Sequence, residues 1–250
     1  MPRQKSPPIL VANWKMNGDS QSIKRLLCDL KRDFLDKELE SQQVIILPPH
    51  VYLQTVAKDL SGTSILIGAQ DTDERESGSV TGGVSAKMLL DVGCEYVLLG
   101  HSERRNLFNE GDGVIFQKLK QAQKVGLKAI VCIGESLEQR NSEQLLEVIS
   151  NQLKPIISQN TLPKSEELLI AYEPVWAIGS KKSASIQQIG YALSKIRKIL
   201  KDVDINLSES TKILYGGSVT EKNIAEILAL DEVDGALIGC LLYTSDAADE

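Results

Sequence analysis

The chain has 250 residues, of which 42% are apolar and 25% are charged, and its formal net charge is −6 at pH 7. This composition is ordinary for a globular protein and excludes a wholly disordered chain. The acidic balance argues against general nucleic-acid binding, and no apolar run is long enough for a membrane span. The first residues lack a secretory apolar segment, so we expect a cytoplasmic location. Four scattered cysteines without a C-x-x-C pair predict no zinc site.

Short apolar runs recur along the whole chain and predict eight strands. Several runs are apolar at nearly every position, which is typical of strands covered on both faces, as in a parallel sheet. In chain order, strands are expected at residues 9–13, 44–47, 65–69, 96–99, 129–133, 168–172, 213–215 and 236–238.

Amphipathic patterns fill most of the gaps and predict helices. The first of them carries Ile23, Leu26, Leu27, Leu30 and Phe34 on one stripe. Helices are expected at residues 22–35, 118–125, 145–157, 186–200 and 224–230.

Strands that alternate with helices predict an α/β protein. A closed (β/α)8 TIM barrel and an open doubly wound sheet share this order of elements. An open sheet usually carries a glycine-rich phosphate turn after its first strand, whereas this chain has NWKMNG at residues 13–18. The closed barrel is therefore favoured. Because no linker precedes residue 240, we expect one barrel domain over residues 1–250.

Polar side chains follow several predicted strands, at the end where α/β barrels carry out their chemistry. Asn13 and Lys15 follow the first strand, His101 the fourth and Glu173 the sixth. Lys15 is either a solvated loop lysine or a fixed positive charge for an anionic substrate. His101 precedes a predicted helix start, whose positive end favours an uncharged imidazole that donates to a carbonyl oxygen. His50 follows two prolines and is interpreted as structural.

Glu173 is followed closely by VWAIGS at residues 175–180, a segment unusually apolar for a loop. Beside Trp176 and Ile178, this carboxylate is either an ordinary surface charge or a partly desolvated general base. A lid that closes over a substrate would explain why an exposed loop is apolar.

Glycines follow the last two predicted strands, as GGS at residues 216–218 and as Gly239. Glycine lets main-chain N–H groups approach an anion closely, and this part of a barrel is a recurrent phosphate site. Each turn alone is also an ordinary tight turn, but the two together indicate phosphate binding.

Five segments of the sequence match a known pattern. They are NWKMN at residues 13–17, GHSERR at 100–105, VCIGE at 131–135, AYEPVWAIG at 171–179 and YGGSV at 215–219. In this order and at this spacing they resemble the triosephosphate isomerase family, over about residues 9–239.

The resemblance implies an aldose–ketose isomerase without cofactor or metal. It would interconvert dihydroxyacetone phosphate and D-glyceraldehyde 3-phosphate through an enediolate, by general acid–base proton transfer, in glycolysis and gluconeogenesis. By position, Glu173 is implied as the base and His101 as the neutral electrophile. Lys15 and Asn13 are implied to support the developing oxyanion, and Glu103 to be a partner of these groups. Triosephosphate isomerase is itself a standard example of this carboxylate–imidazole pairing.

The resemblance also implies two binding surfaces. A homodimer would form through the loop from about Asp71 to Val84. The implied substrate-binding residues are Asn13, Lys15, Gly179, Ser218, Gly239 and Cys240.

The sequence departs from the family pattern at three places. Lys181 replaces a glycine near the lid tip, which adds strain of about 1 kcal/mol if the position needs a positive φ. Gly83 replaces a glutamate in the dimer loop, so Arg104 loses one cross-subunit partner. Cys240 replaces a second glycine. The tail at residues 241–250 has no amphipathic stripe, so we expect the closing helix to be missing or altered.

Two alternatives stay open. A different barrel enzyme, acting on a phosphorylated sugar or an indole-type substrate, would share the glycines but not the pairing of His101 with Glu173. A degenerate, non-catalytic barrel that binds a phosphate ligand would follow from the altered lid and C-terminal segment. An isomerase assay on the purified protein separates these possibilities.

Overall fold

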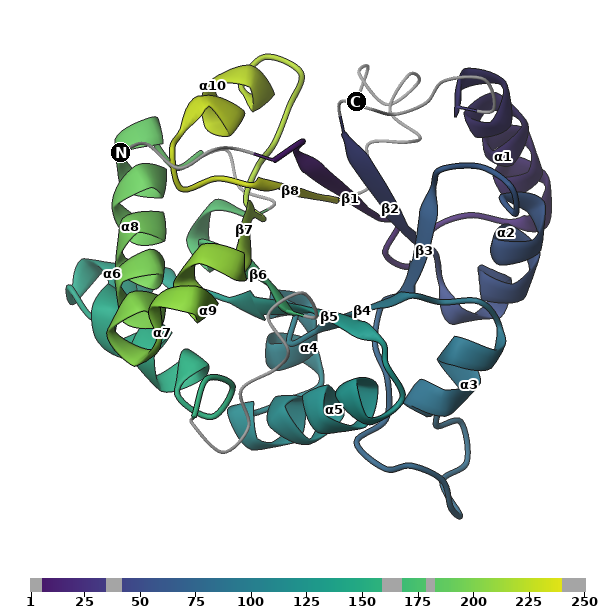
Figure 1. Ribbon diagram of the computed structural model, residues 1–250, viewed down its shortest axis with the longest axis horizontal. Helices are drawn as coiled ribbons and strands as arrows, with labels where there is room; N and C mark the ends of the chain where they lie inside the picture. The colour runs from purple at the N-terminus through teal and green to yellow at the C-terminus, as the bar shows by residue number, and fades with distance from the viewer. Residues whose placement is uncertain (1–5, 35–41, 159–167, 179–182, 240–250) are drawn as a thin grey trace.

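Parallel strands form a closed barrel in sequential order, with helices around its outside (Figure 1). This computed structural model describes residues 6–34, 42–158, 168–178 and 183–239. The α/β barrel class and all eight predicted strands are confirmed. The strands are β1 (Ile9–Asn13), β2 (Gln43–Leu47), β3 (Leu66–Ala69), β4 (Tyr96–Leu99), β5 (Lys128–Ile133), β6 (Leu168–Tyr172), β7 (Lys212–Tyr215) and β8 (Gly235–Gly239).

Helices connect the strands and cover the outer face of the barrel. None of those in the described part of the chain is both long and apolar enough to cross a membrane. They are α1 (Ser20–Phe34), α2 (Leu53–Asp59), α3 (Ala86–Asp91), α4 (Ser102–Leu107), α5 (Asp112–Lys124), α6 (Leu137–Asn141), α7 (Leu145–Leu153), α8 (Ile186–Val203), α9 (Ile205–Ser210) and α10 (Ile224–Ala229), with 3₁₀ turns η1 (His50–Tyr52) and η2 (Val175–Ala177).

Two helix boundaries differ from the sequence prediction for physical reasons. Helix α7 ends at Leu153 rather than at residue 157, because Pro155 has no N–H with which to continue the helical hydrogen bonds. Helix α5 begins at Asp112, six residues before the predicted start. Gly111 and Gly113 flank that start, and glycine's low helix propensity conceals it in the sequence.

The strands are buried on both faces, as their apolar runs predicted. Every residue of β4 and of β6 is buried. Inward-facing side chains such as Val11, Leu98 and Leu214 fill the barrel, and a second, larger apolar cluster packs between strands and helices. Gly235 is needed where β8 closes on β1, since a Cβ there would lie 1.9 Å from the carbonyl oxygen of Ile9.

The strand register brings the carboxyl ends of distant strands together. The last residue of β1, Asn13, is in register with Gly239 at the end of β8. On the opposite side of the barrel, Ile133 of β5 is in register with Tyr172, which precedes Glu173. The residues predicted at strand ends therefore surround a single barrel mouth.

Predictions for several residues fall outside the described part of the chain. These are the predictions for Gly179, Lys181, Cys240 and the tail at residues 241–250, and they stay predictions.

Candidate active site

A cavity of about 290 Å³ opens at the carboxyl end of the barrel. Most of the predicted site residues line it, so the structure brings them together. Glu103 lines an adjoining cavity of about 500 Å³, which shares several walls with the first. Among the described residues, no group of three or more His, Cys, Asp or Glu side chains could hold a metal ion. The predicted residues that line the 290 Å³ cavity are Asn13, Lys15, His101, Glu173, Ser218 and Gly239.

Glu173 is fixed in a buried position directly after β6. It is only 2% exposed, and its main-chain N–H donates to the carbonyl oxygen of Ile133 at 2.7 Å. Its Oε2 accepts from the main-chain N–H of Ser102 at 2.9 Å, and its Oε1 lies 3.0 Å from Nε2 of His101. The carboxylate is thus oriented by two donors and shielded from bulk water, as a general base requires.

His101 is the N-cap residue of α4, and its ring is buried. Its Nδ1 accepts from the main-chain N–H of Glu103 at 3.3 Å. A nitrogen that accepts carries no proton, so Nε2 is the protonated nitrogen of a neutral imidazole. The Glu103 carboxylate lies 3.5 Å from Nδ1, but its closer partner is Lys15. The helix therefore presents Nε2–H to the cavity as a hydrogen-bond donor.

Lys15 reaches the cavity from a turn with strained backbone. Its φ is +53°, a left-handed conformation that costs a non-glycine residue about 1–2 kcal/mol. Its main-chain N–H donates to Oδ1 of Asn13 at 2.9 Å, and its Nζ lies 2.6 Å from Oε1 of Glu103. A Cβ at Gly239 would lie 3.3 Å from Cε of Lys15, so the lysine side chain passes closely over the end of β8.

The glycine-rich loop after β7 forms another wall of the cavity. The N–H of Gly216 donates to the carbonyl oxygen of Tyr172 at 2.8 Å. A Cβ at Gly216 would lie 2.9 Å from Cγ of Glu173, so any residue larger than glycine would push the loop away from the Glu173 side chain. The carbonyl oxygen of Ser218 accepts from Nδ2 of Asn223 at 3.1 Å, which orders the loop. Main-chain groups are thereby brought to the cavity, as an anion site needs.

Comparison with known proteins shows the family of the chain. The family model Triosephosphate isomerase matches residues 8–247 of the chain. The chain belongs to the triosephosphate isomerase family. The family predicted from the five sequence segments is thus confirmed.

Relatives named triosephosphate isomerase align over most of their length. The protein from Coxiella burnetii (strain Dugway 5J108-111) is 41% identical over 233 residues, which cover 93% of this chain and 91% of the relative. The protein from Alkaliphilus oremlandii is 42% identical over 233 residues, or 93% of each chain. The protein from Shewanella sediminis is 40% identical over 240 residues, or 93% of this chain and 91% of the relative.

In this member of the triosephosphate isomerase family, the start of the predicted lid is anchored to buried Glu135. The indole N–H of Trp176 donates to Glu135 at 2.9 Å, and the Tyr172 hydroxyl donates to the same carboxylate at 3.0 Å. Burial, reinforced by Glu135, raises the pKa of Tyr172 far above its usual value and keeps this donor protonated. The sequence pattern placed Trp176 beside Glu173. Its indole N–H bonds Glu135 instead, while Ile178 lines the Glu173 cavity.

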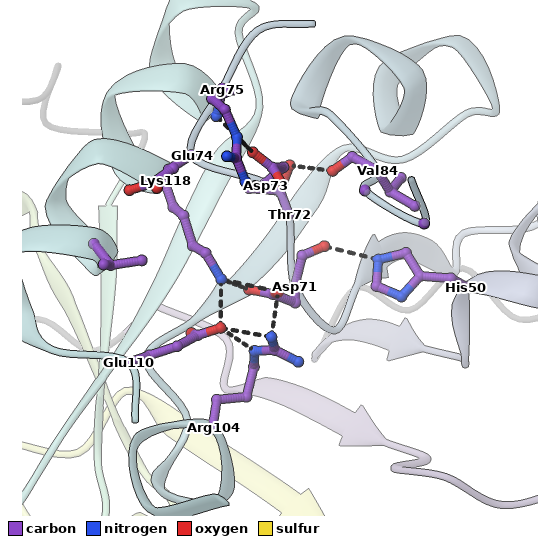
Figure 2. A pocket seen from close by; sticks show the side chains of 13 residues that line it. His50, Asp71, Thr72, Asp73, Glu74, Arg75, Val84, Arg104, Glu110 and Lys118 are labelled. Carbon is purple, nitrogen blue, oxygen red and sulfur yellow. Dashed lines mark hydrogen bonds and ion pairs between the residues drawn. The ribbon is translucent and has the colours of Figure 1, made fainter. Parts of the chain in front are cut away.

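Two cationic and two anionic side chains form ion pairs in a separate cavity of about 440 Å³ (Figure 2). Nζ of Lys118 is 2.7 Å from both Asp71 and Glu110. Nη2 of Arg104 is 2.9 Å from Asp71 and 2.5 Å from Glu110. The sequence predicted that Arg104 lacks one cross-subunit partner, and within the chain it has these two carboxylates. Because α4 carries Arg104 and has His101 as its N-cap, the cluster holds the helix that presents the imidazole.

The pKa values of the two carboxylates in this cluster are shifted in opposite directions. Burial, opposed by Lys118, raises the pKa of Asp71 above its ordinary value of 3.8. Burial acts on Glu110 too, but hydrogen bonds from Arg104 and Lys118 outweigh it and hold the pKa of Glu110 below its ordinary 4.5. By linkage, the free energy of unfolding falls as pH rises above 3.8, because Asp71 then loses a proton that the folded chain binds more tightly than the unfolded chain. Glu110 contributes stability that is lost as pH falls below 4.5.

We expect Glu110→Gln to destabilise the fold far more than Asp71→Asn. At pH 7, the loss should be about 3–5 kcal/mol for Glu110→Gln, because two cations lose a favourable buried partner. For Asp71→Asn it should be about 1 kcal/mol or less. Urea unfolding at fixed protein concentration measures both. Toward acidic pH, the stability lost in Glu110→Gln should shrink and the stability lost in Asp71→Asn should grow. Equal losses in the two variants at neutral pH would contradict the opposite pKa shifts.

The sequence pattern does not single out two groups that hold the site. The main-chain N–H of Ser102 orients Glu173, and a main-chain donor leaves no residue-type signal. The amide of Gln70 donates to the carbonyl oxygens of Lys15 and Leu47, both at 2.9 Å. Gln70 directly follows the predicted strand at residues 65–69, so the strand-end rule that found the other site residues also applies to it.

Proposed function

We propose that the chain interconverts dihydroxyacetone phosphate and D-glyceraldehyde 3-phosphate through an enediolate. The observation that carries this proposal is the 3.0 Å approach of Glu173 Oε1 to His101 Nε2, in a cavity that Lys15 also lines. A buried carboxylate beside a neutral N–H donor suits proton removal next to a carbonyl group. No feature of the described residues favours the alternative of a non-catalytic phosphate-binding barrel.

In the proposed mechanism, the Glu173 carboxylate takes a proton from the carbon next to the substrate carbonyl. Negative charge then develops on the carbonyl oxygen, where Nε2–H of His101 and the ammonium of Lys15 stabilise it. His101 relays the hydroxyl proton to the former carbonyl oxygen, and the protonated Glu173 returns its proton to the former carbonyl carbon, so that the carbonyl group forms on the other carbon. Asn13 holds the Lys15 turn through its side chain, and Glu103 pairs with the Lys15 ammonium at the mouth of the cavity.

The substrate phosphate takes no part in bond making, but its binding supports the reaction. We assign it to main-chain groups of Ser218 and Gly239, together with the predicted contributions of Gly179 and Cys240. Binding energy from a non-reacting group can be used to close a lid over the reacting atoms. Closure excludes water from the enediolate, which would otherwise tend to lose its phosphate.

An assay coupled to glycerol 3-phosphate dehydrogenase tests the proposal on the purified protein. We expect dihydroxyacetone phosphate to form from D-glyceraldehyde 3-phosphate, which the coupled enzyme reports as oxidation of NADH. Absence of turnover, with glycerol 3-phosphate still bound, would favour the non-catalytic barrel. Because this reaction serves glycolysis and gluconeogenesis, we infer that the chain acts in the cytoplasm.

We also propose that the chain forms a homodimer through the loop from about Asp71 to Val84. This loop joins β3 to α3 and projects from the barrel (Figure 1). Met16 and Leu107 are 96% and 74% exposed, and both line the 500 Å³ cavity beside the active site. In a symmetric dimer, the projecting loop of each protomer could enter the exposed apolar cavity of its partner.

Leu107→Asp is expected to weaken the proposed dimer about tenfold or more, because a charge would be buried without a partner. Sedimentation velocity from nanomolar to micromolar protein measures the shift. Tyr191→Asp is the matched control, since Tyr191 is also exposed but lies on α8. A wild-type chain that is monomeric at micromolar concentration would contradict the dimer proposal.

A further inference from the structure

Gln70 connects the turn that carries Lys15 to two neighbouring strands. It directly follows β3, and its Nε2 donates to the carbonyl oxygens of Lys15 and of Leu47, each at 2.9 Å. The same Leu47 oxygen accepts the main-chain N–H of Trp14 at 3.1 Å. One side-chain amide thus bridges the end of β3, the end of β2 and the turn after β1.

This bridge ends at a strained residue. The φ of Lys15 is +53°, and only Lys15, Asn109 and Glu143 among the described non-glycine residues have a positive φ. Such a conformation persists only where its surroundings fix it. At Lys15, the main-chain N–H is held by Oδ1 of Asn13 and the carbonyl oxygen by Gln70. Side chains from two strand ends therefore hold both polar main-chain groups of this residue.

The backbone conformation of Lys15 decides where its side chain points. The aliphatic chain crosses the end of β8, where a Cβ at Gly239 would lie 3.3 Å from Lys15 Cε. The ammonium ends 2.6 Å from Oε1 of Glu103 and lines the same cavity as Glu173. A return of Lys15 to negative φ would redirect its Cα–Cβ bond and withdraw the ammonium from this position.

We propose that Gln70 is a positioning residue for the isomerase reaction. Its amide holds Lys15 in the left-handed conformation that aims the ammonium into the substrate cavity. This inference rests on the proposed function, in which Lys15 supports the substrate anion. Gln70 lines the adjoining cavity and is one step removed from the reacting atoms.

Gln70→Met tests the proposal because it keeps the length of the side chain and removes both N–H donors. We expect kcat/KM to fall about 10- to 100-fold, as a misplacement of about 1 Å can cause, and glycerol 3-phosphate to bind more weakly. Gln70→Glu, which also lacks N–H donors, should act in the same direction and provides a second variant if Gln70→Met does not fold.

Gln43→Met is the matched control for a purely structural role. Gln43 is also half-buried, and its Nε2 donates to the Tyr96 hydroxyl at 3.3 Å from the amino end of β2. We expect Gln43→Met to lower thermal stability while leaving kcat/KM unchanged. Kinetic parameters of Gln70→Met that match those of Gln43→Met would overturn the positioning role.

A double-mutant cycle with Lys15→Met separates this inference from the proposed function. If Gln70 acts through Lys15, adding Gln70→Met to Lys15→Met should change neither kcat/KM nor the affinity for glycerol 3-phosphate further. If the effects of Gln70→Met and Lys15→Met were fully additive, the proposed role of Gln70 would be overturned and that of Lys15 would stand. Wild-type activity of Lys15→Met would overturn both the role of Gln70 and the proposed role of Lys15.

Discussion

Glu173→Gln is expected to lower kcat at least about 10²- to 10⁴-fold while the protein stays folded. Glutamine keeps the size of the side chain and one oxygen that can accept from the Ser102 N–H, as Oε2 of Glu173 does at 2.9 Å. It cannot accept a proton from carbon. The coupled assay measures the loss of turnover, and calorimetry with glycerol 3-phosphate should show that phosphate binding is retained.

Glu95→Gln is the control for this change, because Glu95 is exposed and precedes β4 at the opposite end of the barrel. Its turnover should equal that of the wild type. If Glu173→Gln retained substantial turnover, Glu173 would not be the base. If it also lost the affinity for glycerol 3-phosphate, its carboxylate would be required for binding rather than for proton transfer alone.

Gly134→Ala is expected to damage both the fold and the catalytic site. A Cβ at Gly134 would lie 1.7 Å from the carbonyl oxygen of Glu173 and 2.6 Å from its carbonyl carbon. Because both neighbours are main-chain atoms, β5 and β6 must separate at the mouth. Overpacking of this kind costs about 1–3 kcal/mol or more. Displacing the base by about 1 Å should lower kcat about 100-fold.

Gly113→Ala provides the comparison for Gly134→Ala. Gly113 lies in α5, and a Cβ there would meet nothing within 4 Å. Alanine is the better helix former, so stability should be unchanged or slightly higher. Urea unfolding and the coupled assay should therefore separate the two alanine variants. Wild-type activity in Gly134→Ala would show that the close approach of β5 to Glu173 does not position the base.

The barrel was predictable because its strands have a strong and simple signal. A strand buried on both faces is apolar throughout, as β6 is, and its length and spacing then limit the architecture. The long helices have clear stripes, whereas α4 and α6 have six and five residues, too few to show a helical period. Helix α6 was therefore missed, and of α4 only the start after His101 was predicted.

The candidate site was predictable where side chains act and not where the main chain acts. Lys15, His101 and Glu173 stand at strand ends, and parallel strands bring such ends to one mouth. The left-handed backbone of Lys15 and the N–H of Ser102 depend on the folded chain, so residue types do not reveal them. The partners of Arg104 were likewise hidden, because Asp71 and Glu110 meet it only through tertiary packing.

Deuterium incorporation tests most directly whether Glu173 moves a proton through an enediolate. The reaction is run from dihydroxyacetone phosphate in D₂O and followed by proton NMR. We predict that the wild type places solvent deuterium at C2 of the glyceraldehyde 3-phosphate formed, and that Glu173→Gln places none above the rate in buffer. Full turnover by the wild type, with no deuterium in the product or in the recovered substrate, would contradict proton transfer by an exchangeable base.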